Sequence, residues 1–120
     1  MAEPSQPGWT RVVTRTGRYE YQFQGRVPAV RKGQYEEASD YQFLVMDEEG
    51  WLYRIPVRLT AGAENEVQQT APGAAVSLAE VQLRAGLEKY RPRQNAPYAE
   101  LDGYFAVDQA RARKLSGGEC

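Results

Sequence analysis

The chain has 120 residues, of which 42% are hydrophobic and 26% charged, and this composition is typical of a single soluble globular domain. It has no histidine, so the commonest general base and the usual zinc ligand are both missing, and we expect a protein that is not an enzyme and holds no metal or cofactor. The formal net charge is -1, so any binding of nucleic acid would have to depend on where the cations lie and not on their total.

The two ends of the chain predict flexible segments around one folded domain. Residues 1–8 are polar and have no apolar stretch of the kind that a secretory signal needs, and residues 116–120 are polar and rich in glycine. We therefore expect one domain over residues 9–115. No apolar run approaches the ~20 residues of a membrane span. Cys120 is the only cysteine and cannot form an internal disulfide, which indicates a reducing, cytoplasmic setting.

The first part of the domain predicts two β-strands. Residues 10–16 are rich in β-branched side chains, and residues 18–27 alternate aromatic with polar side chains. Gly25, inside the second strand, indicates a bulge or a sharp bend. Residues 28–40 follow as a loop that carries basic and aromatic side chains.

A β-hairpin is predicted for residues 41–60, with an acidic turn that ends in glycine. Pro56 cannot donate a ladder hydrogen bond, so we expect it at a sheet edge or a bulge. Trp51, beside the turn, fits either a lid over the core or a platform on which a base stacks. The alternation along both predicted strand pairs gives one core face: Tyr19, Tyr21, Phe23, Val27, Tyr41, Phe43, Val45, Tyr53, Ile55, Val57 and Leu59. The opposite face of the hairpin carries Gln42, Leu44, Met46, Leu52, Arg54, Pro56 and Arg58.

The segment after the hairpin is ambiguous. Residues 63–69 predict a short helix. Residues 74–90 fit a helix with a capping box at Ser77, or a strand over residues 74–83 with a bulge near Glu80. The local pattern alone slightly favours the helix.

The end of the domain predicts a loop, a strand and a helix. Residues 91–97 have the composition of a loop, and residues 98–107 fit a last strand. Residues 108–115 fit a short terminal helix with Asp108 as its N-cap.

The order of these elements resembles the oligonucleotide/oligosaccharide-binding fold of single-strand-binding proteins and replication protein A. Over residues 18–107, YQFQGRV is similar to the bent first strand of that fold, FLVMDEEGWLYRIPVRL to its second and third strands, and APGAAVSLAEVQL to the entry into its fourth. The resemblance implies a mainly β protein with a five-stranded Greek-key barrel and one short helix between strands three and four, to which the terminal pattern adds a short C-terminal helix. It favours the strand for residues 74–83.

The resemblance also implies a function. In such barrels a single strand of nucleic acid crosses strands two and three between two loops. Cations on those loops neutralise phosphates, and exposed rings stack on the bases. The resemblance therefore implies binding of single-stranded nucleic acid, DNA rather than RNA, with little sequence specificity. The expected site residues are Arg26, Arg31, Lys32, Tyr35, Trp51, Arg54, Arg58, Lys89, Tyr90, Arg91 and Arg93.

Other interpretations stay open. Arg54 and Arg58 also fit a solvated sheet face, and Arg91-Pro92-Arg93 also fits an exposed connection without a ligand. The near-zero net charge and unpaired strand edges would suit a protein-interaction module or an assembly subunit, either as a homo-oligomer or with a protein partner. An enzyme has the weakest support, because no nucleophile or acid–base pair can be assembled from the sequence.

Overall fold

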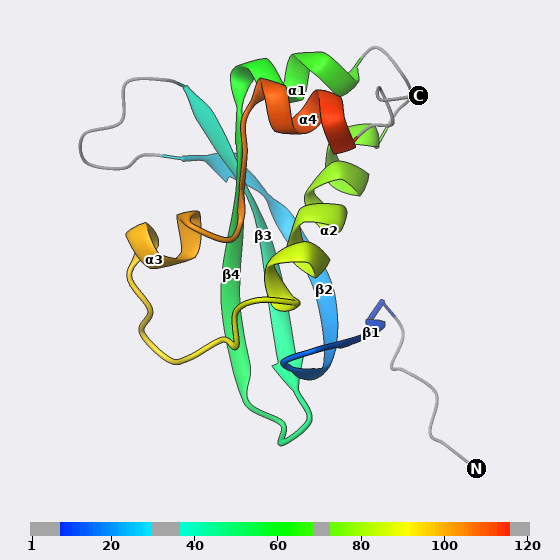
Figure 1. Ribbon diagram of the computed structural model, residues 1–120, viewed down its shortest axis with the longest axis vertical. Coiled ribbons are helices and arrows are strands. Elements are labelled where there is room, and N and C mark those ends of the chain that lie inside the picture. Colours follow the sequence, from blue (N-terminus) through cyan, green and yellow to red (C-terminus); the bar gives the residue numbers. More distant parts are fainter. Residues whose placement is uncertain (1–7, 30–36, 69–72, 116–120) are drawn as a thin grey trace.

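The computed structural model describes residues 8–29, 37–68 and 73–115. It is mainly β, with a curled five-stranded sheet and helices of which the longest lies across one face of the sheet (Figure 1). The strands are β1 (Thr10–Thr14), β2 (Gly17–Pro28), β3 (Ala38–Asp47), β4 (Leu52–Thr60) and β5 (Ala106–Val107). The helices are α1 (Ala61–Gln68), α2 (Ala74–Leu87), α3 (Tyr98–Asp102) and α4 (Gln109–Leu115).

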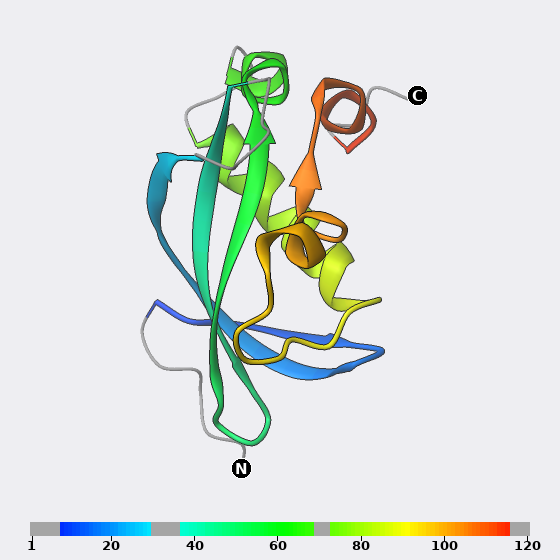
Figure 2. The same cartoon turned by 90° about the vertical axis from the view of Figure 1, so that its left-hand side faces the viewer.

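The described strands lie in the sheet in their chain order. β1 to β4 are antiparallel neighbours, and β5 runs parallel to β4, where it pairs with Arg58 and Leu59. Figure 2 shows that β1 and the start of β2 bend toward the side on which α2 lies, so the sheet curls like one half of a barrel. A five-stranded, barrel-like sheet is therefore confirmed, whereas a closed barrel with Greek-key order is not.

Residues 74–83 are helical, so the strand that the resemblance predicts there is wrong. A strand would put Ala79 and Gln82, which are both buried, on opposite faces, whereas a helix puts residues three apart on one face. α2 begins at Ala74, three residues before the predicted capping box at Ser77. The local periodicity is therefore the better guide here, and the buried residues of α2 are Leu78, Ala79, Gln82, Leu83, Gly86 and Leu87.

The last predicted strand, residues 98–107, is right only for its end. Its first half is the short helix α3, and only Ala106 and Val107 pair with β4. Leu101 and Phe105 are both buried, and the N–H of Phe105 donates to the carbonyl of Leu101 at 2.8 Å. This spacing of four residues is helical. A strand over the whole segment would keep the two side chains on one face but place them about 13 Å apart.

The two short helices predicted on either side of this region are confirmed. α1 begins at Ala61, two residues before the predicted start, and residue 69 lies outside the described residues. The Oδ1 atom of Asp108 accepts the backbone N–H of Arg111 at 2.8 Å, as expected of an N-cap before α4.

The inner face of the sheet and α2 form the core, and a bulge in β2 ends the alternation that the sequence predicts. The register of β2 against β3 shifts between Phe23 and Gly25, and the φ of 148° at Gly25 favours glycine. Beyond this bulge Arg26 takes the inner position and Val27 is exposed, so the core position predicted for Val27 is wrong. The predicted core residues that are buried are Tyr19, Tyr21, Tyr41, Phe43, Val45, Ile55, Val57 and Leu59.

Two other predicted core residues lie at the margins of the core. Phe23, next to the bulge, is 37% exposed, although its ring still stacks on that of Tyr41. Tyr53 is half-buried, and its hydroxyl donates to Asp47 at 2.9 Å. The core predicted from alternation is therefore correct at its centre and too wide at its ends.

Pro56 lies where a missing N–H costs least. The backbone N–H of Arg58 donates outward to the carbonyl of Phe105 in the turn before β5, at 2.8 Å. Backbone groups two residues apart in a strand point the same way, so the nitrogen of Pro56 also faces away from β3. The predicted edge position of Pro56 is confirmed.

Among the described residues, no helix has both the length and the apolar character that crossing a membrane requires.

Replacement of Gly86 by alanine tests the contact between α2 and the turn before β5. A Cβ at position 86 would lie 2.8 Å from the carbonyl oxygen of Tyr104 and closer still to the ring of Phe105. Alanine favours a helix by about 1 kcal/mol over glycine, but overpacking at a site this tight costs about 1–3 kcal/mol or more. We expect Gly86→Ala to lower the melting temperature measured by circular dichroism. An unchanged or raised melting temperature would show that Phe105 moves aside freely.

Candidate binding surface

The side of the sheet opposite α2, here called the outer face, is the main surface on which a ligand would find uncovered strands. Strand alternation in the observed register assigns side chains to it. It mixes apolar, amide and charged groups, with more arginines than acids. Members that are not buried include Arg11, Val13, Arg18, Glu20, Gln22, Gln42, Leu44, Met46, Leu52 and Arg54, whereas Asp40 and Pro56 on the same face are buried.

The outer face continues into a hollow beside β4, here called the β4 hollow, with a volume of about 550 Å³. Arg54 stands on the strand side, and Arg93 stands on the loop that joins α2 to α3. The side-chain amide of Gln94 donates to the carbonyl of Leu52 at 3.0 Å and fastens this loop to the strand. The remaining lining is mostly apolar, with Leu44, Leu52, Tyr53, Ile55, Pro92, Ala96 and Leu101 beside Gln94 and Asn95.

The edge of β4 is unpaired where it borders this hollow. The N–H of Asp47 donates to the carbonyl of Trp51 at 3.0 Å, so odd-numbered residues of β4 pair with β3 and even-numbered ones point to the edge. Both backbone groups of Arg54 therefore face away from β3. β5 pairs with β4 only at Arg58 and Leu59, so no described strand reaches Arg54.

Tyr90 and Arg93, two predicted ligand contacts, are tied to Glu100 on α3. Arg93 holds this carboxylate with two hydrogen bonds, of 2.9 and 2.5 Å, and the hydroxyl of Tyr90 donates to it as well. The Arg93 guanidinium, followed by the Tyr90 hydroxyl, lowers the pKa of Glu100. Burial, with the hydrogen bond to Glu100, raises the pKa of Tyr90 to about 12. The ring of Tyr90 is only 8% exposed and stacks on Tyr104, so it has almost no free face for a base.

Arg26 is likewise engaged by an acid within the molecule. Its guanidinium donates to the carboxylate of Glu64 at 2.7 and 3.1 Å, and the hydroxyl of Tyr41 donates to the same group. Glu64 is only 6% exposed. Burial alone would raise its pKa, but the hydrogen bonds from Arg26 and Tyr41 outweigh burial, so the pKa of Glu64 lies below its ordinary value. The β2 bulge causes this arrangement, because it turns Arg26 to the inner face.

The other predicted site residues are scattered. Arg91 donates to the carbonyl of Thr16 at 2.7 Å and so joins the loop after α2 to the β1–β2 turn. Lys89 is exposed, and Trp51 is 59% exposed, which excludes its alternative as a lid over the core. Arg58 is half-buried, and its Nε atom has no hydrogen-bond partner among the described residues.

The structure thus brings together only part of the predicted site. Arg54 and Arg93 line the same hollow, whereas Arg26 belongs to the inner face. Three predicted site residues lie outside the described residues: Arg31, Lys32 and Tyr35. The apolar wall of the β4 hollow is not predicted from the sequence as part of a site. The signal is present, because strand alternation places Leu44 and Leu52 on the face opposite the core.

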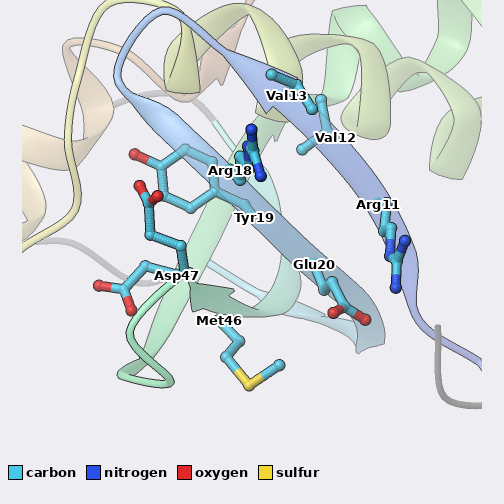
Figure 3. A pocket seen from close by; sticks show the side chains of 9 residues that line it. Arg11, Val12, Val13, Arg18, Tyr19, Glu20, Met46 and Asp47 are labelled. Carbon is cyan, nitrogen blue, oxygen red and sulfur yellow. The ribbon is translucent and has the colours of Figure 1, made fainter. Parts of the chain in front are cut away.

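A second hollow of about 450 Å³ lies on the outer face between the β1–β2 hairpin and the end of β3. Figure 3 shows Arg11 and Val13 on β1, Glu20 on β2 and Met46 on β3 around it. Its charges are of both signs, with Arg11 and Arg18 against Glu20, Asp47 and Glu48. It therefore offers no single charge preference to a ligand.

In the ranges that the structure describes, no cluster of three or more histidine, cysteine or carboxylate side chains could hold a metal ion. Comparison with known proteins finds no matching family model, no matching curated protein and no matching solved structure.

Replacement of Glu64 by glutamine tests the ion pair with Arg26. Because the pKa of Glu64 is lowered in the folded state, its contribution to stability is complete above its ordinary value of 4.5 and is lost as pH falls through the folded value. We expect Glu64→Gln to reduce the free energy of unfolding at pH 7 by about 1–2 kcal/mol, since Arg26 keeps access to water. Urea titrations at neutral pH and near pH 3 should show this difference shrinking in acid. The exposed-turn variant Glu49→Gln is the control, and a Glu64→Gln difference that stays constant with pH would contradict the assignment.

Proposed function

We propose that this protein is a non-enzymatic interaction module that binds an extended segment of a protein partner along the free edge of β4. The observation that carries the proposal is the unpaired backbone of Arg54 at the wall of the β4 hollow. An unpaired strand edge is a template for another strand, and many peptide-binding domains use such an edge.

The shape and lining of the hollow support this proposal. Strand addition takes its affinity from main-chain hydrogen bonds and its specificity from hollows that receive alternate side chains. The β4 hollow offers both beside one strand, because Arg54 presents the free backbone groups and Leu44, Leu52 and Ala96 line the adjoining wall. The loop that carries Gln94 forms the opposite wall, so a guest segment would have contacts on two sides.

Single-stranded nucleic acid is the second candidate ligand. Two observations favour it: Arg54 and Arg93 line one hollow, and Trp51 is exposed beside β4. If nucleic acid is the ligand, we would also propose that the likeness to an oligonucleotide-binding barrel extends from the shape of the sheet to its function. It ranks second because Arg26 and Arg93 already hold carboxylates and Tyr90 is buried, so fewer cations and rings are free for a polyanion.

Strand addition predicts that bound peptides need the backbone N–H of residue 54. Peptides selected from a random display library on the immobilised protein are measured against Arg54→Ala, which keeps the N–H, and Arg54→Pro, which removes it. Proline is tolerated two residues along the same edge, at Pro56, so we expect both variants to fold. The selected peptides should still bind Arg54→Ala measurably, even where an acidic side chain of the peptide loses its contact with the guanidinium, and should not bind Arg54→Pro.

Hydrogen exchange of the unmodified protein gives a second readout that requires no variant. A selected peptide should slow exchange of the Arg54 amide while leaving amides in the β1–β2 turn unchanged. Selected peptides that bind both variants equally, or that leave the Arg54 amide unprotected, would count against strand addition.

Nucleic-acid binding predicts a different pattern. A fluorescent mixed-sequence DNA single strand should then bind with an affinity that falls steeply between low and high salt, and both Arg54→Ala and Arg93→Ala should weaken it. Anisotropy titrations measure this. Salt-sensitive binding of this kind, together with failure of peptide selection, would replace the first candidate by the second.

A further inference from the structure

We infer that the β4 hollow selects an extended segment in which an acidic residue lies opposite Arg54 and an apolar residue lies two positions away, opposite Leu52. This inference rests on the proposed function and names the chemistry of the partner segment.

The charge of the hollow favours a carboxylate. Its lining contains two arginines and no acidic residue. Arg93 is already held by Glu100, whereas Arg54 is exposed and makes no ion pair within the described part of the chain. A guest carboxylate could accept charge-assisted hydrogen bonds from Arg54. A guanidinium can bind both carboxylate oxygens at once.

Strand geometry then places the neighbouring guest side chain. Residues directly opposite each other in paired strands point to the same face, with Cβ atoms about 4.5–5.5 Å apart. A guest residue opposite Arg54 therefore shares the outer face with it. The next guest residue on that face lies opposite Leu52, where its backbone N–H competes with the side-chain amide of Gln94 for the carbonyl of Leu52. Leu44 and Ala96 border the same hollow, so an apolar side chain fits at this second position.

The free edge is too short to allow many registers. Pro56 has no N–H to donate, and the carbonyl of Leu52 already accepts a hydrogen bond from Gln94. The N–H of Arg58 is used by Phe105. Arg54 is therefore the residue at which a guest strand finds both a free donor and a free acceptor, and the guest must be centred there.

A symmetric peptide tests the inference whichever way the guest strand runs. The labelled heptapeptide Gly-Leu-Thr-Glu-Thr-Leu-Gly has leucine two residues from glutamate on both sides, so it satisfies parallel and antiparallel pairing alike. We expect saturable binding by fluorescence anisotropy and about tenfold weaker binding to Arg54→Ala, which corresponds to the loss of one charge-assisted contact. The same peptide with lysine in place of glutamate should not bind.

Two controls separate charge from position. Arg18→Ala removes another exposed arginine of the outer face, in β2, and should bind the heptapeptide as the unmodified protein does. A peptide of the same composition with its leucines on either side of the glutamate, Gly-Thr-Leu-Glu-Leu-Thr-Gly, should bind more weakly, because side chains next to the glutamate point to the opposite face of the guest strand.

The outcomes also separate this inference from the proposed function. If library peptides bind in a manner that needs the N–H of residue 54 but the acidic heptapeptide does not bind, the inference is overturned and strand addition stands. Equal binding to Arg54→Ala, or equal binding of the lysine peptide, would also overturn it. If neither library peptides nor the heptapeptide bind and a DNA single strand does, both proposals fall.

Discussion

The packing of α2 into the curve of the sheet is the contact on which the rest of the structure depends. Leu83 and Leu87 are fully buried against the inner face, and Gly86 has no side chain to hold the next layer away. Phe105 can therefore lie against the helix backbone, and this contact brings β5 to the edge of β4. α2 covers the inner face, and no described helix of similar length lies across the outer face.

Carboxylates within the fold decide which cations remain free. A buried or half-buried carboxylate is costly without a partner, so Glu64 and Glu100 each hold an arginine and a tyrosine hydroxyl. These groups fasten α1 to the sheet and α3 to the loop after α2. What remains beside the β4 hollow is chiefly the charge of Arg54, which suits a single acidic side chain better than a chain of phosphates.

The edge of β4 shows how a fold can keep one short stretch of backbone accessible. β5 pairs with the C-terminal part of this edge, at Arg58 and Leu59, and Gln94 donates to the carbonyl of Leu52. Between these two points, Pro56 has no backbone N–H to donate. Such features limit edge-to-edge aggregation, because a long flat edge would pair with any other strand. Within the described part of the chain, they leave Arg54 as the residue of this edge with both backbone groups available, and this restriction gives the surface its selectivity in our proposal.

Several elements can be predicted from the residues alone because their signal is local. The hairpin around the acidic turn, the bulge at Gly25, the edge position of Pro56 and the N-cap Asp108 follow from turn chemistry and periodicity. The local pattern also favours a helix at residues 74–90, whereas the fold-level resemblance predicts a strand at residues 74–83 and is wrong there. Tertiary structure alone decided the pairing of Arg26 and Arg93 with acids, because those partners are distant in the chain or on a helix that the pattern did not predict. It likewise decided that β5 stops short of Arg54, since strand length depends on which neighbours pack beside it.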